Sequence, residues 1–197
     1  MAEHYFDGSP TSDDRRRDVT TRIWDRELVF TTSSGVFSQD GLDKATAVLL
    51  RNSTPPTGGV VLDLGCGWGP IACSLATTSA TVWAVDVNER ALELTRLNAE
   101  RLGVTVHASL PGDVPADLVF DQIWSNPPIR VGKQALHDLL LQWLPRLAPD
   151  GVARLVVGKN LGADSLQRWL VEQGWPTARV DSEKGFRILE IRRSTAA

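Results

Sequence analysis

Asn126 stands directly before two prolines, Pro127 and Pro128, at the end of an apolar run. The residue before a proline is driven toward extended geometry, and Pro127 carries no N–H group. The side-chain oxygen of Asn126 and the carbonyl of Pro127 can therefore offer two acceptors to a single amino group. An amine held in this way keeps its lone pair free to attack an electrophile, and both acceptors stabilise the positive charge that develops on nitrogen. An Asn-Pro turn without chemistry is the competing interpretation.

A glycine-rich segment, DLGCGWG over residues 63–69, follows another apolar run. Its glycines, at positions 65, 67 and 69, allow a tight turn after a strand and a close approach of the backbone to a ligand. The helix that follows would point its N–H groups toward that ligand. The spacing departs from the dinucleotide fingerprint G-x-G-x-x-G, because position 70 is proline, and this argues against NAD. A plain strand-to-helix turn is the structural alternative.

Asp86 ends a third apolar run, downstream of the glycine-rich segment. A carboxylate at the end of such a strand can accept hydrogen bonds from both hydroxyls of a ribose. The alternative is an exposed aspartate that caps the next helix. Because the carboxylate and the glycine-rich segment occur together, the sequence favours a ligand that contains a nucleoside.

Alternating strands and helices are predicted to position these groups. The spacing of apolar residues predicts strands over 60–64, 81–87, 104–110, 118–126, 152–158, 177–182 and 186–193, and helices over 70–78, 88–103, 135–147 and 164–174. This order is typical of an α/β fold with a Rossmann-like, doubly wound, seven-stranded and mostly parallel sheet. The strand ends that carry Asp63, Asp86 and Asn126 would then face one crevice.

Two of the predicted helices carry recognisable end signals. Asn88 can cap the first turn of the helix over 88–103, and Gly103 can end it. Asp164 and Gly174 are expected to do the same for the helix over 164–174.

The first 54 residues are expected to form an arm, a β-hairpin and a helix that pack on a core made of residues 55–197, in one compact unit. Residues 1–17 are polar and rich in turn formers, which indicates a loose arm. Two β-rich runs, Thr20–Trp24 and Leu28–Thr32, flank the letters DRE and predict the hairpin. A helical pattern over residues 41–52 follows.

The composition argues against several classes of protein. With 197 residues and a net charge of −3, the chain has the size of one domain and no basic excess for tight nonspecific binding to a polyanion. No apolar run reaches the roughly 20 residues that cross a membrane, and the N-terminus lacks the apolar centre of a secretory signal, which favours the cytoplasm. The two cysteines are too few for a disulfide framework and the histidines are scattered, so no metal is expected. The sequence indicates no particular oligomeric state.

The motifs DLGCGWG, AVDVN and SNPPI, in this order, resemble those of class I S-adenosylmethionine-dependent methyltransferases that act on amino groups. The segment GVFS at 35–38, followed by LDKATAVLL, narrows the resemblance, as do the opening HYF and the closing KGFRILEIRR. Together they are similar to the bacterial small-subunit ribosomal RNA guanine-N2 methyltransferases, which contain the "methyltransferase small" domain. The resemblance extends from His4 to about Arg192.

This resemblance implies that S-adenosyl-L-methionine is the cofactor and that ribosomal RNA, or the small-subunit particle, is the partner. The methyl acceptor would be an exocyclic amine, with guanine N2 of 16S ribosomal RNA as the first candidate. The resemblance assigns the amine to the turn at Asn126, Pro127 and Pro128. It assigns the cofactor to the strand ends and the GVFS segment, which supply Asp63, Gly65, Cys66, Gly67, Gly69, Asp86, Val87, Val36 and Phe37.

Several residues beyond this turn are candidates for substrate contacts. Many amino-methyltransferases place an aromatic residue after Asn-Pro-Pro, where it stacks on a flipped base, but this chain has Ile129. Trp68 and Trp124 are candidate replacements, although Trp124 is more typical of a core residue. Charged residues near the predicted crevice can meet RNA phosphates or can simply belong to exposed loops, and these are Arg130, Lys133 and Lys159.

Two other functions compete with RNA methylation. A protein methyltransferase that acts on a glutamine amide would use the same Asn-Pro-Pro turn, but it usually has an aromatic residue at position 129 and lacks the GVFS segment. A catalytically silent module that binds the cofactor and assists assembly is the alternative outside enzymes. The intact Asn126 and Pro127 argue against that alternative.

Overall fold

The computed structural model describes residues 13–78 and 80–194, with the side chain of residue 130 left out. A two-stranded hairpin and a seven-stranded sheet are present, with the sheet order β5-β4-β3-β6-β7-β9-β8. The hairpin consists of β1 (Arg16–Ile23) and β2 (Arg26–Ser33). The strands of the sheet are β3 (Val60–Leu64), β4 (Thr81–Val85), β5 (Val106–Ser109), β6 (Phe120–Ser125), β7 (Leu147–Gly158), β8 (Thr177–Glu183) and β9 (Phe186–Arg192).

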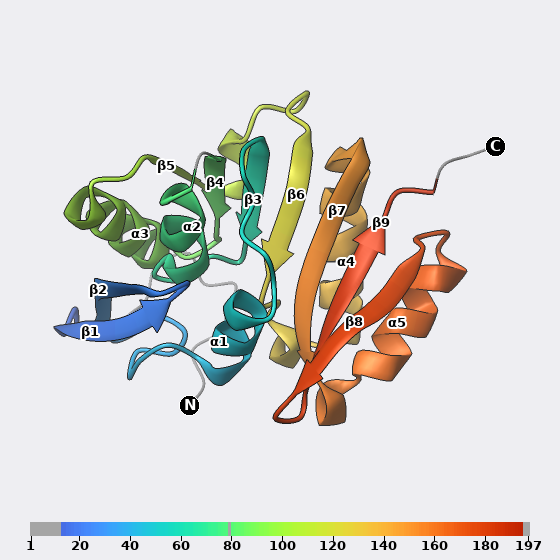
Figure 1. Ribbon diagram of the computed structural model, residues 1–197, viewed down its shortest axis with the longest axis horizontal. Coiled ribbons are helices and arrows are strands. Elements are labelled where there is room, and N and C mark those ends of the chain that lie inside the picture. Colours follow the sequence, from blue (N-terminus) through green and yellow to red (C-terminus); the bar gives the residue numbers. More distant parts are fainter. Residues whose placement is uncertain (1–12, 79, 195–197) are drawn as a thin grey trace.

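The first five strands of this sheet run parallel, and β9 and β8 close it with antiparallel pairs. The helices are α1 (Lys44–Arg51), α2 (Pro70–Ala76), α3 (Glu89–Leu102), α4 (Lys133–Trp143) and α5 (Ala163–Glu172). Short 3-10 turns lie between these elements, at η1 (Pro111–Asp113), η2 (Ile129–Val131), η3 (Leu144–Arg146) and η4 (Lys159–Leu161). The predicted fold class is therefore confirmed (Figure 1).

Two apolar clusters cover the two faces of the sheet. On one face, α1, α2, α3 and the hairpin pack on side chains such as Val61 and Val82. On the other face, α4 and α5 pack on side chains such as Leu62 and Leu155. Successive residues of β3 thus face opposite clusters, as the pleat of a strand requires. A strand buried on both faces reads as a continuous apolar run, which explains the VVLDL signal.

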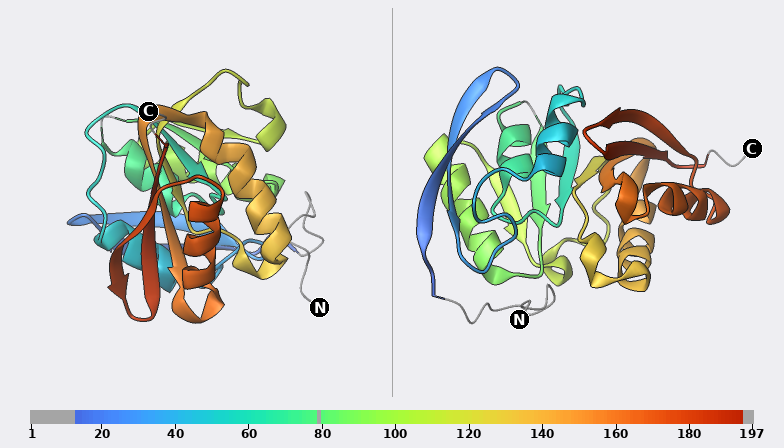
Figure 2. Two further views of the ribbon diagram at one scale, coloured as in Figure 1. Left: turned by 90° about the vertical axis from the view of Figure 1, so that its right-hand side faces the viewer. Right: turned by 90° about the horizontal axis from the view of Figure 1, so that it is seen from below.

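A buried amide on α3 helps to dock the hairpin, beside the ion pairs Arg16–Glu93 and Asp18–Arg101. The side chain of Asn98 accepts a hydrogen bond from the Thr31 N–H at 2.6 Å and donates to the Thr31 carbonyl at 2.8 Å. It also donates to the carbonyl of Trp68, at 2.8 Å, and so ties the hairpin to the glycine-rich loop. Figure 2 shows the hairpin lying along the outer side of α3.

The hairpin differs from its prediction in turn and length. Trp24 and Asp25 form a two-residue turn with φ of 46° and 64°, the left-handed pair that matches the twist of the two strands. The turn is therefore not DRE, and Trp24 is not in a strand. Arg16 and Arg17 lie in β1 rather than in a loose arm, of which residues 1–12 fall outside the described residues.

Helix ends follow local chemistry in most places. Asn88 caps α3 by accepting hydrogen bonds from two backbone N–H groups, and Gly103 ends it at φ 66°, both as predicted. Asp164 does not cap α5, since the N-cap is Gly162 and Asp164 lies within the first turn. The predicted helix over 135–147 instead begins at Lys133 and gives way to a 3-10 turn that contains a proline.

Candidate functional site

The glycine-rich loop after β3 turns through three left-handed residues, with φ of 77° at Gly65, 56° at Gly67 and 84° at Gly69. A Cβ at Gly69 would meet Thr95 Oγ1 at 2.8 Å, so this position requires glycine on two grounds. The N–H groups of Gly65 and Cys66 both donate to the carbonyl of Val85, which fixes the loop to the end of β4. The loop is therefore held by backbone contacts, with close packing at Gly69 and open space at Gly67.

Asp63 is fully buried beneath this loop, and only one of its two carboxylate oxygens has a hydrogen-bond partner among the described residues. Its Oδ2 accepts a hydrogen bond from the Ala72 N–H at 2.9 Å, but its Oδ1 has no partner among the described residues. Burial raises the pKa of this carboxyl to about 8, and the negative charge of Asp86 contributes to the rise to a smaller degree. A buried oxygen without a partner is costly in a folded protein, which makes Asp63 suited to a ligand that carries a positive charge.

Asp86 lies at the end of β4, as predicted, and is buried with 4% exposure. Its Oδ1 accepts from the Asn88 N–H and its Oδ2 from the Gly67 N–H, both at 2.9 Å. Burial raises its pKa, and these backbone hydrogen bonds oppose the rise. A carboxylate has about four lone-pair sites, so capacity remains to accept a ribose hydroxyl beside these backbone hydrogen bonds.

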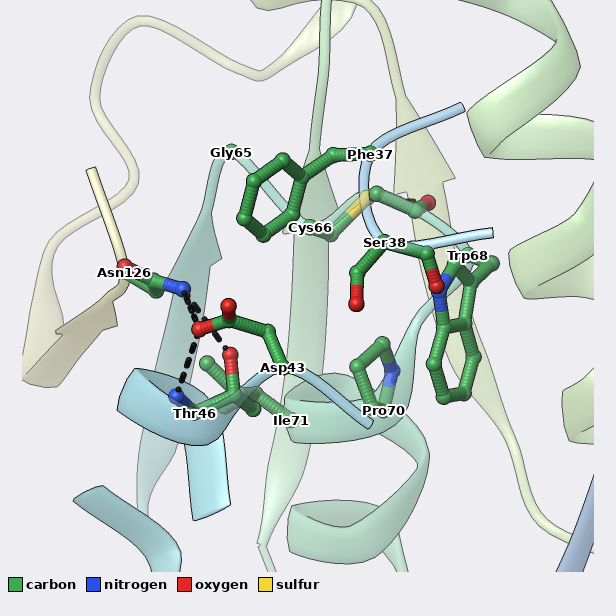
Figure 3. A pocket seen from close by; sticks show the side chains of 11 residues that line it. Phe37, Ser38, Asp43, Thr46, Gly65, Cys66, Trp68, Pro70, Ile71 and Asn126 are labelled. Carbon is green, nitrogen blue, oxygen red and sulfur yellow. Dashed lines mark hydrogen bonds between the residues drawn. The ribbon is translucent and has the colours of Figure 1, made fainter. Parts of the chain in front are cut away.

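Asn126 follows β6, and both hydrogens of its side-chain amide are engaged. Its Nδ2 donates to Asp43 Oδ2 at 2.9 Å and to Thr46 Oγ1 at 3.0 Å. Asp43 also caps α1, because the same oxygen accepts from the N–H groups of Ala45 and Thr46. Figure 3 shows the Asn126 side chain directed toward this cap. These acceptors fix the orientation of the amide and leave its Oδ1 without a partner among the described residues.

The prolines after Asn126 form an inverse γ-turn. Pro128 has φ −75° and ψ 71°, and the Ile129 N–H donates to the Pro127 carbonyl at 2.8 Å. The sequence predicts that this carbonyl can accept a hydrogen bond from an amine, and the turn uses one of its two lone pairs. The second lone pair remains for a ligand.

The segment 35–38 closes over these groups. The Gly35 carbonyl accepts from the Asn88 side chain at 2.9 Å, and the Ser38 carbonyl accepts from the Trp68 indole at 3.3 Å. Val36 is buried, whereas Phe37 is 54% exposed. A small cavity of about 20 Å³ remains beneath, and its lining includes Phe37, Ser38, Asp43, Gly65, Cys66, Gly67 and Asn126.

The structure thus brings the predicted amine turn and the predicted cofactor loop to one cavity. Four of the predicted cofactor residues do not line this cavity, namely Asp63, Asp86, Val87 and Val36. Asp86 contacts the glycine-rich loop from one side, and Val87 is half-buried next to Asp86. The opening holds about one water molecule, whereas nucleoside ligands occupy sites of roughly 300 Å³ or more.

Neither tryptophan proposed for base stacking is accessible. Trp68 is buried with its ring edge against Phe30, and Trp124 is buried against Trp24. The exposed aromatic side chain at the cavity is Phe37. Trp124 is a core residue, as the sequence indicated, and the stacking expectation fails for Trp68 because its ring also fills the core beside the hairpin.

The predicted substrate residues lie beyond the γ-turn. Ile129 is half-buried against the cluster of α4 and α5, Lys133 is the exposed first residue of α4, and Lys159 is exposed in η4. Arg130 lies in η2, and its side chain is outside the described structure. Sequence reasoning missed Asp43 and Thr46, whose pattern before a helix signals only a cap.

No helix in the described ranges is long and apolar enough to cross a membrane. The same residues contain no group of three or more His, Cys, Asp or Glu side chains placed to hold a metal ion. Cys66 and Cys73 are free and buried.

Comparison with known proteins identifies several relatives. A family model described as "Methyltransferase small domain" matches residues 27–190. The uncharacterized protein YbxB of Bacillus subtilis (strain 168) is 34% identical over 98% of this chain and 100% of its own length. Ribosomal RNA small subunit methyltransferase C of Salmonella arizonae is 41% identical over 68% of this chain, but only 41% of that protein is covered.

Solved structures give the same picture. The 16S rRNA N2 G1207 methyltransferase of T. thermophilus, solved with AdoMet and guanosine, has a TM-score of 0.76 and 25% identity. The match covers 90% of this chain and 50% of that one. A methyltransferase from Pyrococcus furiosus shares the fold, with a TM-score of 0.68 and 21% identity over 83% of this chain and 87% of its own. This chain thus spans about half or less of the two ribosomal RNA methyltransferases named here.

Proposed function

Because the chain belongs to the methyltransferase small domain family and uses S-adenosyl-L-methionine as its cofactor, we propose that it methylates an exocyclic amine of ribosomal RNA. The first candidate for that amine is guanine N2 of 16S RNA. Two relatives support this assignment: one is a ribosomal RNA small subunit methyltransferase, and the other is a 16S rRNA N2 methyltransferase solved with guanosine.

The observation that carries the proposal is the fixed amide of Asn126. Asp43 and Thr46 take both of its N–H hydrogens, so the oxygen is the group left to meet a substrate. An amide oriented this way accepts a hydrogen bond from an incoming amine and cannot present a donor to it. That polarity suits a nitrogen nucleophile that carries hydrogens.

The residues present fit the cofactor. The unpartnered Oδ1 of Asp63 would meet the positively charged amino group of its methionine part, and Asp86 would accept the ribose hydroxyls. Gly65, Cys66, Gly67 and Gly69 would hold the methionine part through a backbone that is free of obstructing side chains. Val87 would lie against the adenine, and Val36 and Phe37 would cover the cofactor from the N-terminal side.

The chemistry of the chain's own residues follows from this geometry. When bound, the cofactor supplies a methyl group on a positively charged sulfur. Asn126 Oδ1 and the second lone pair of the Pro127 carbonyl would accept the two N–H groups of the target amine and leave its lone pair free. Both oxygens would stabilise the positive charge that grows on nitrogen as the carbon–nitrogen bond forms. The amine proton then leaves to water, so no general base is required.

Residues beyond the turn would contact the rest of the substrate. Pro128 shapes the turn, and Ile129 would pack against the target base without an aromatic face. Lys133 and Lys159 are exposed cations at the carboxyl end of the sheet, where RNA phosphates would lie. Arg130, next to Ile129 in the chain, is proposed for the same role.

The test is methyl transfer from labelled cofactor to fractions of a strain that lacks this protein. Purified small subunits, their RNA and their proteins are incubated separately, and a reaction with excess S-adenosylhomocysteine serves as the control. We expect label in RNA that is recovered as N2-methylguanosine after digestion. Label on glutamine side chains would instead identify a protein methyltransferase. Binding of S-adenosylhomocysteine without label in any fraction would identify a silent binding module.

A further inference from the structure

A second cavity, of about 200 Å³, lies between the N-terminal halves of α4 and α5, at the carboxyl end of β7. Its walls include apolar side chains such as Ile129, Leu136 and Leu166, and polar ones such as Lys133 and His137. The volume is below the roughly 300–1,000 Å³ of sites for drug-sized ligands. A single ring system therefore suits this cavity better than a whole cofactor.

The ring nitrogens of His137, in the wall of this cavity, are open to solvent, because neither is among the fully buried side-chain atoms that lack a hydrogen-bond partner. It is 8% exposed, and its ring stacks on Trp169 at a centroid distance of 3.5 Å. Within residues 13–78 and 80–194, neither ring nitrogen bonds to a protein atom. Burial, and to a smaller degree the charge of Lys133, lowers its pKa, whereas the charge of Asp138 opposes this; the neutral form of the ring offers one donor and one acceptor. A ligand that enters the cavity can therefore replace water on both nitrogens.

Positive potential gathers at the mouth of the cavity. Helices α4 and α5 begin there, at Lys133 and just after Gly162, and neither N-terminus has a side-chain cap. Uncapped N–H groups and the helix dipole favour an anion, and the exposed ammonium of Lys133 adds to this. Two carboxylates also lie on these helices: Asp164 pairs with Arg187, whereas Asp138 accepts from a neutral side-chain amide on α4 and keeps its charge.

The cavity adjoins the amine-binding turn through one residue. The Ile129 N–H donates to the Pro127 carbonyl, and Ile129 also lines the cavity. A group bound there is therefore the immediate neighbour of an amine held at Asn126. In single-stranded nucleic acid, successive bases reach neighbouring sites while the phosphate between them follows positive charge.

We propose that this cavity binds the base of a nucleotide adjacent to the methylated one, with His137 on its ring edge and the connecting phosphate at Lys133 and the start of α4. The inference rests on the proposed RNA substrate and deepens it. Contacts to base edges select sequence, whereas phosphate contacts only position the chain. The cavity would thus read the sequence context that a single amine at Asn126 does not provide.

Occupancy is tested by the imidazole signals of the ¹⁵N-labelled protein. Three histidines contribute signals, and His137→Phe assigns the relevant one. The titrants are the four nucleoside monophosphates, inorganic phosphate, and a glutamine-containing peptide. We expect at least one nucleotide to shift the His137 signals, with phosphate and peptide inactive. Three results would each overturn the proposal. Equal shifts with phosphate alone would identify the cavity as an anion site, and shifts with the peptide alone would indicate a protein ligand. Unchanged His137 signals with every titrant would show that the cavity stays empty.

Kinetics supply a second test with a matched control. His137→Phe keeps a ring on Trp169 and removes both nitrogens, while His107→Phe makes the same change where His107 stacks on Trp83 at the far edge of the sheet. For RNA, we expect His137→Phe to lower kcat/KM about five- to tenfold, the loss of one hydrogen bond or more. Methylation of free guanosine and binding of S-adenosylhomocysteine should not change, and the control should match the unmodified protein. Equal rates for both variants on RNA would overturn the proposal.

These measurements separate the inference from the function on which it rests. If nucleotides shift the His137 signals but no RNA is methylated, the cavity is a nucleotide site and the proposed reaction is wrong. If RNA is methylated at the expected amine while nucleotides leave the His137 signals unchanged, the proposed reaction is correct and the cavity has no part in it.

Discussion

Replacing the buried Asp63 by asparagine is expected to stabilise the protein without cofactor and to weaken cofactor binding. In the folded protein Oδ1 has no partner, and burial raises the pKa of the carboxyl from 3.8 to about 8. A carboxyl whose folded-state pKa lies above its usual value contributes stability that is fully present below about pH 4. This contribution is lost as pH rises toward 8.

The magnitude follows from the same values. At pH 7 the rise from 3.8 to about 8 corresponds to an upper bound of about 4 kcal/mol, at 1.36 kcal/mol for each pKa unit. Asparagine keeps the acceptor for the Ala72 N–H but buries an unpaired N–H₂ group, which costs about 1–3 kcal/mol. We expect a net gain of about 1–2 kcal/mol at pH 7, which raises Tm by about 2–8 °C in a chain of this size.

The assay is thermal unfolding at pH 5 and pH 8, with Asp150→Asn as the matched control at an exposed position. The advantage of Asp63→Asn over the unmodified protein should grow from pH 5 to pH 8, and the control should show no such trend. Calorimetry should show S-adenosylhomocysteine binding weakened about 10- to 150-fold, the value of a hydrogen bond to a charged group. A variant that is less stable at pH 8, or that binds as tightly as before, would refute this account of Asp63.

Three further substitutions test the other parts of the site. Asp86→Ala should weaken S-adenosylhomocysteine binding about 10- to 150-fold by calorimetry, because the ribose loses a charged acceptor; undiminished affinity would remove Asp86 from the site. Thr46→Val should slow single-turnover methyl transfer about tenfold with cofactor affinity unchanged, because the Asn126 amide loses one of its two hydrogen-bond acceptors. An unchanged rate would show that the hydrogen bond to Thr46 is dispensable. Phe37→Ala should weaken S-adenosylhomocysteine binding several-fold, because the ligand loses apolar contact worth on the order of 1 kcal/mol. Tm should change little, since Phe37 is largely exposed. Equal affinity would show that Phe37 does not cover the cofactor.

The sheet and most of its helices could be predicted from the sequence because their signals are local. Continuous apolar runs mark strands buried on both faces, and Asn88 and Gly103 cap α3 through contacts within a few residues. The crevice followed from topology alone, since the ends of parallel strands meet at one edge. The placement of the loop after β3, of Asp86 and of Asn126 was therefore predictable.

The contacts that could not be predicted depend on tertiary packing. Asp43 shows its cap pattern in the sequence, but its hydrogen bond to Asn126 joins positions far apart in the chain. Trp68 lies within the glycine-rich motif, and only its packing on Phe30 shows that it belongs to the core. Asp164 looked like a cap by type and position, yet Gly162 adopts the left-handed conformation that begins α5.

The central claim is that the Asn126 oxygen holds the target amine while the cofactor site stands apart from it. Its most direct test is single-turnover methyl transfer by Asn126→Ala, measured beside S-adenosylhomocysteine affinity on the same preparation. Deletion of one preorganised polar group that faces developing charge lowers rates by about 10²–10³, and we expect that loss with cofactor affinity nearly unchanged. Transfer at the unmodified rate would contradict the claim, and Asn126-Pro127-Pro128 would then be a turn without chemistry.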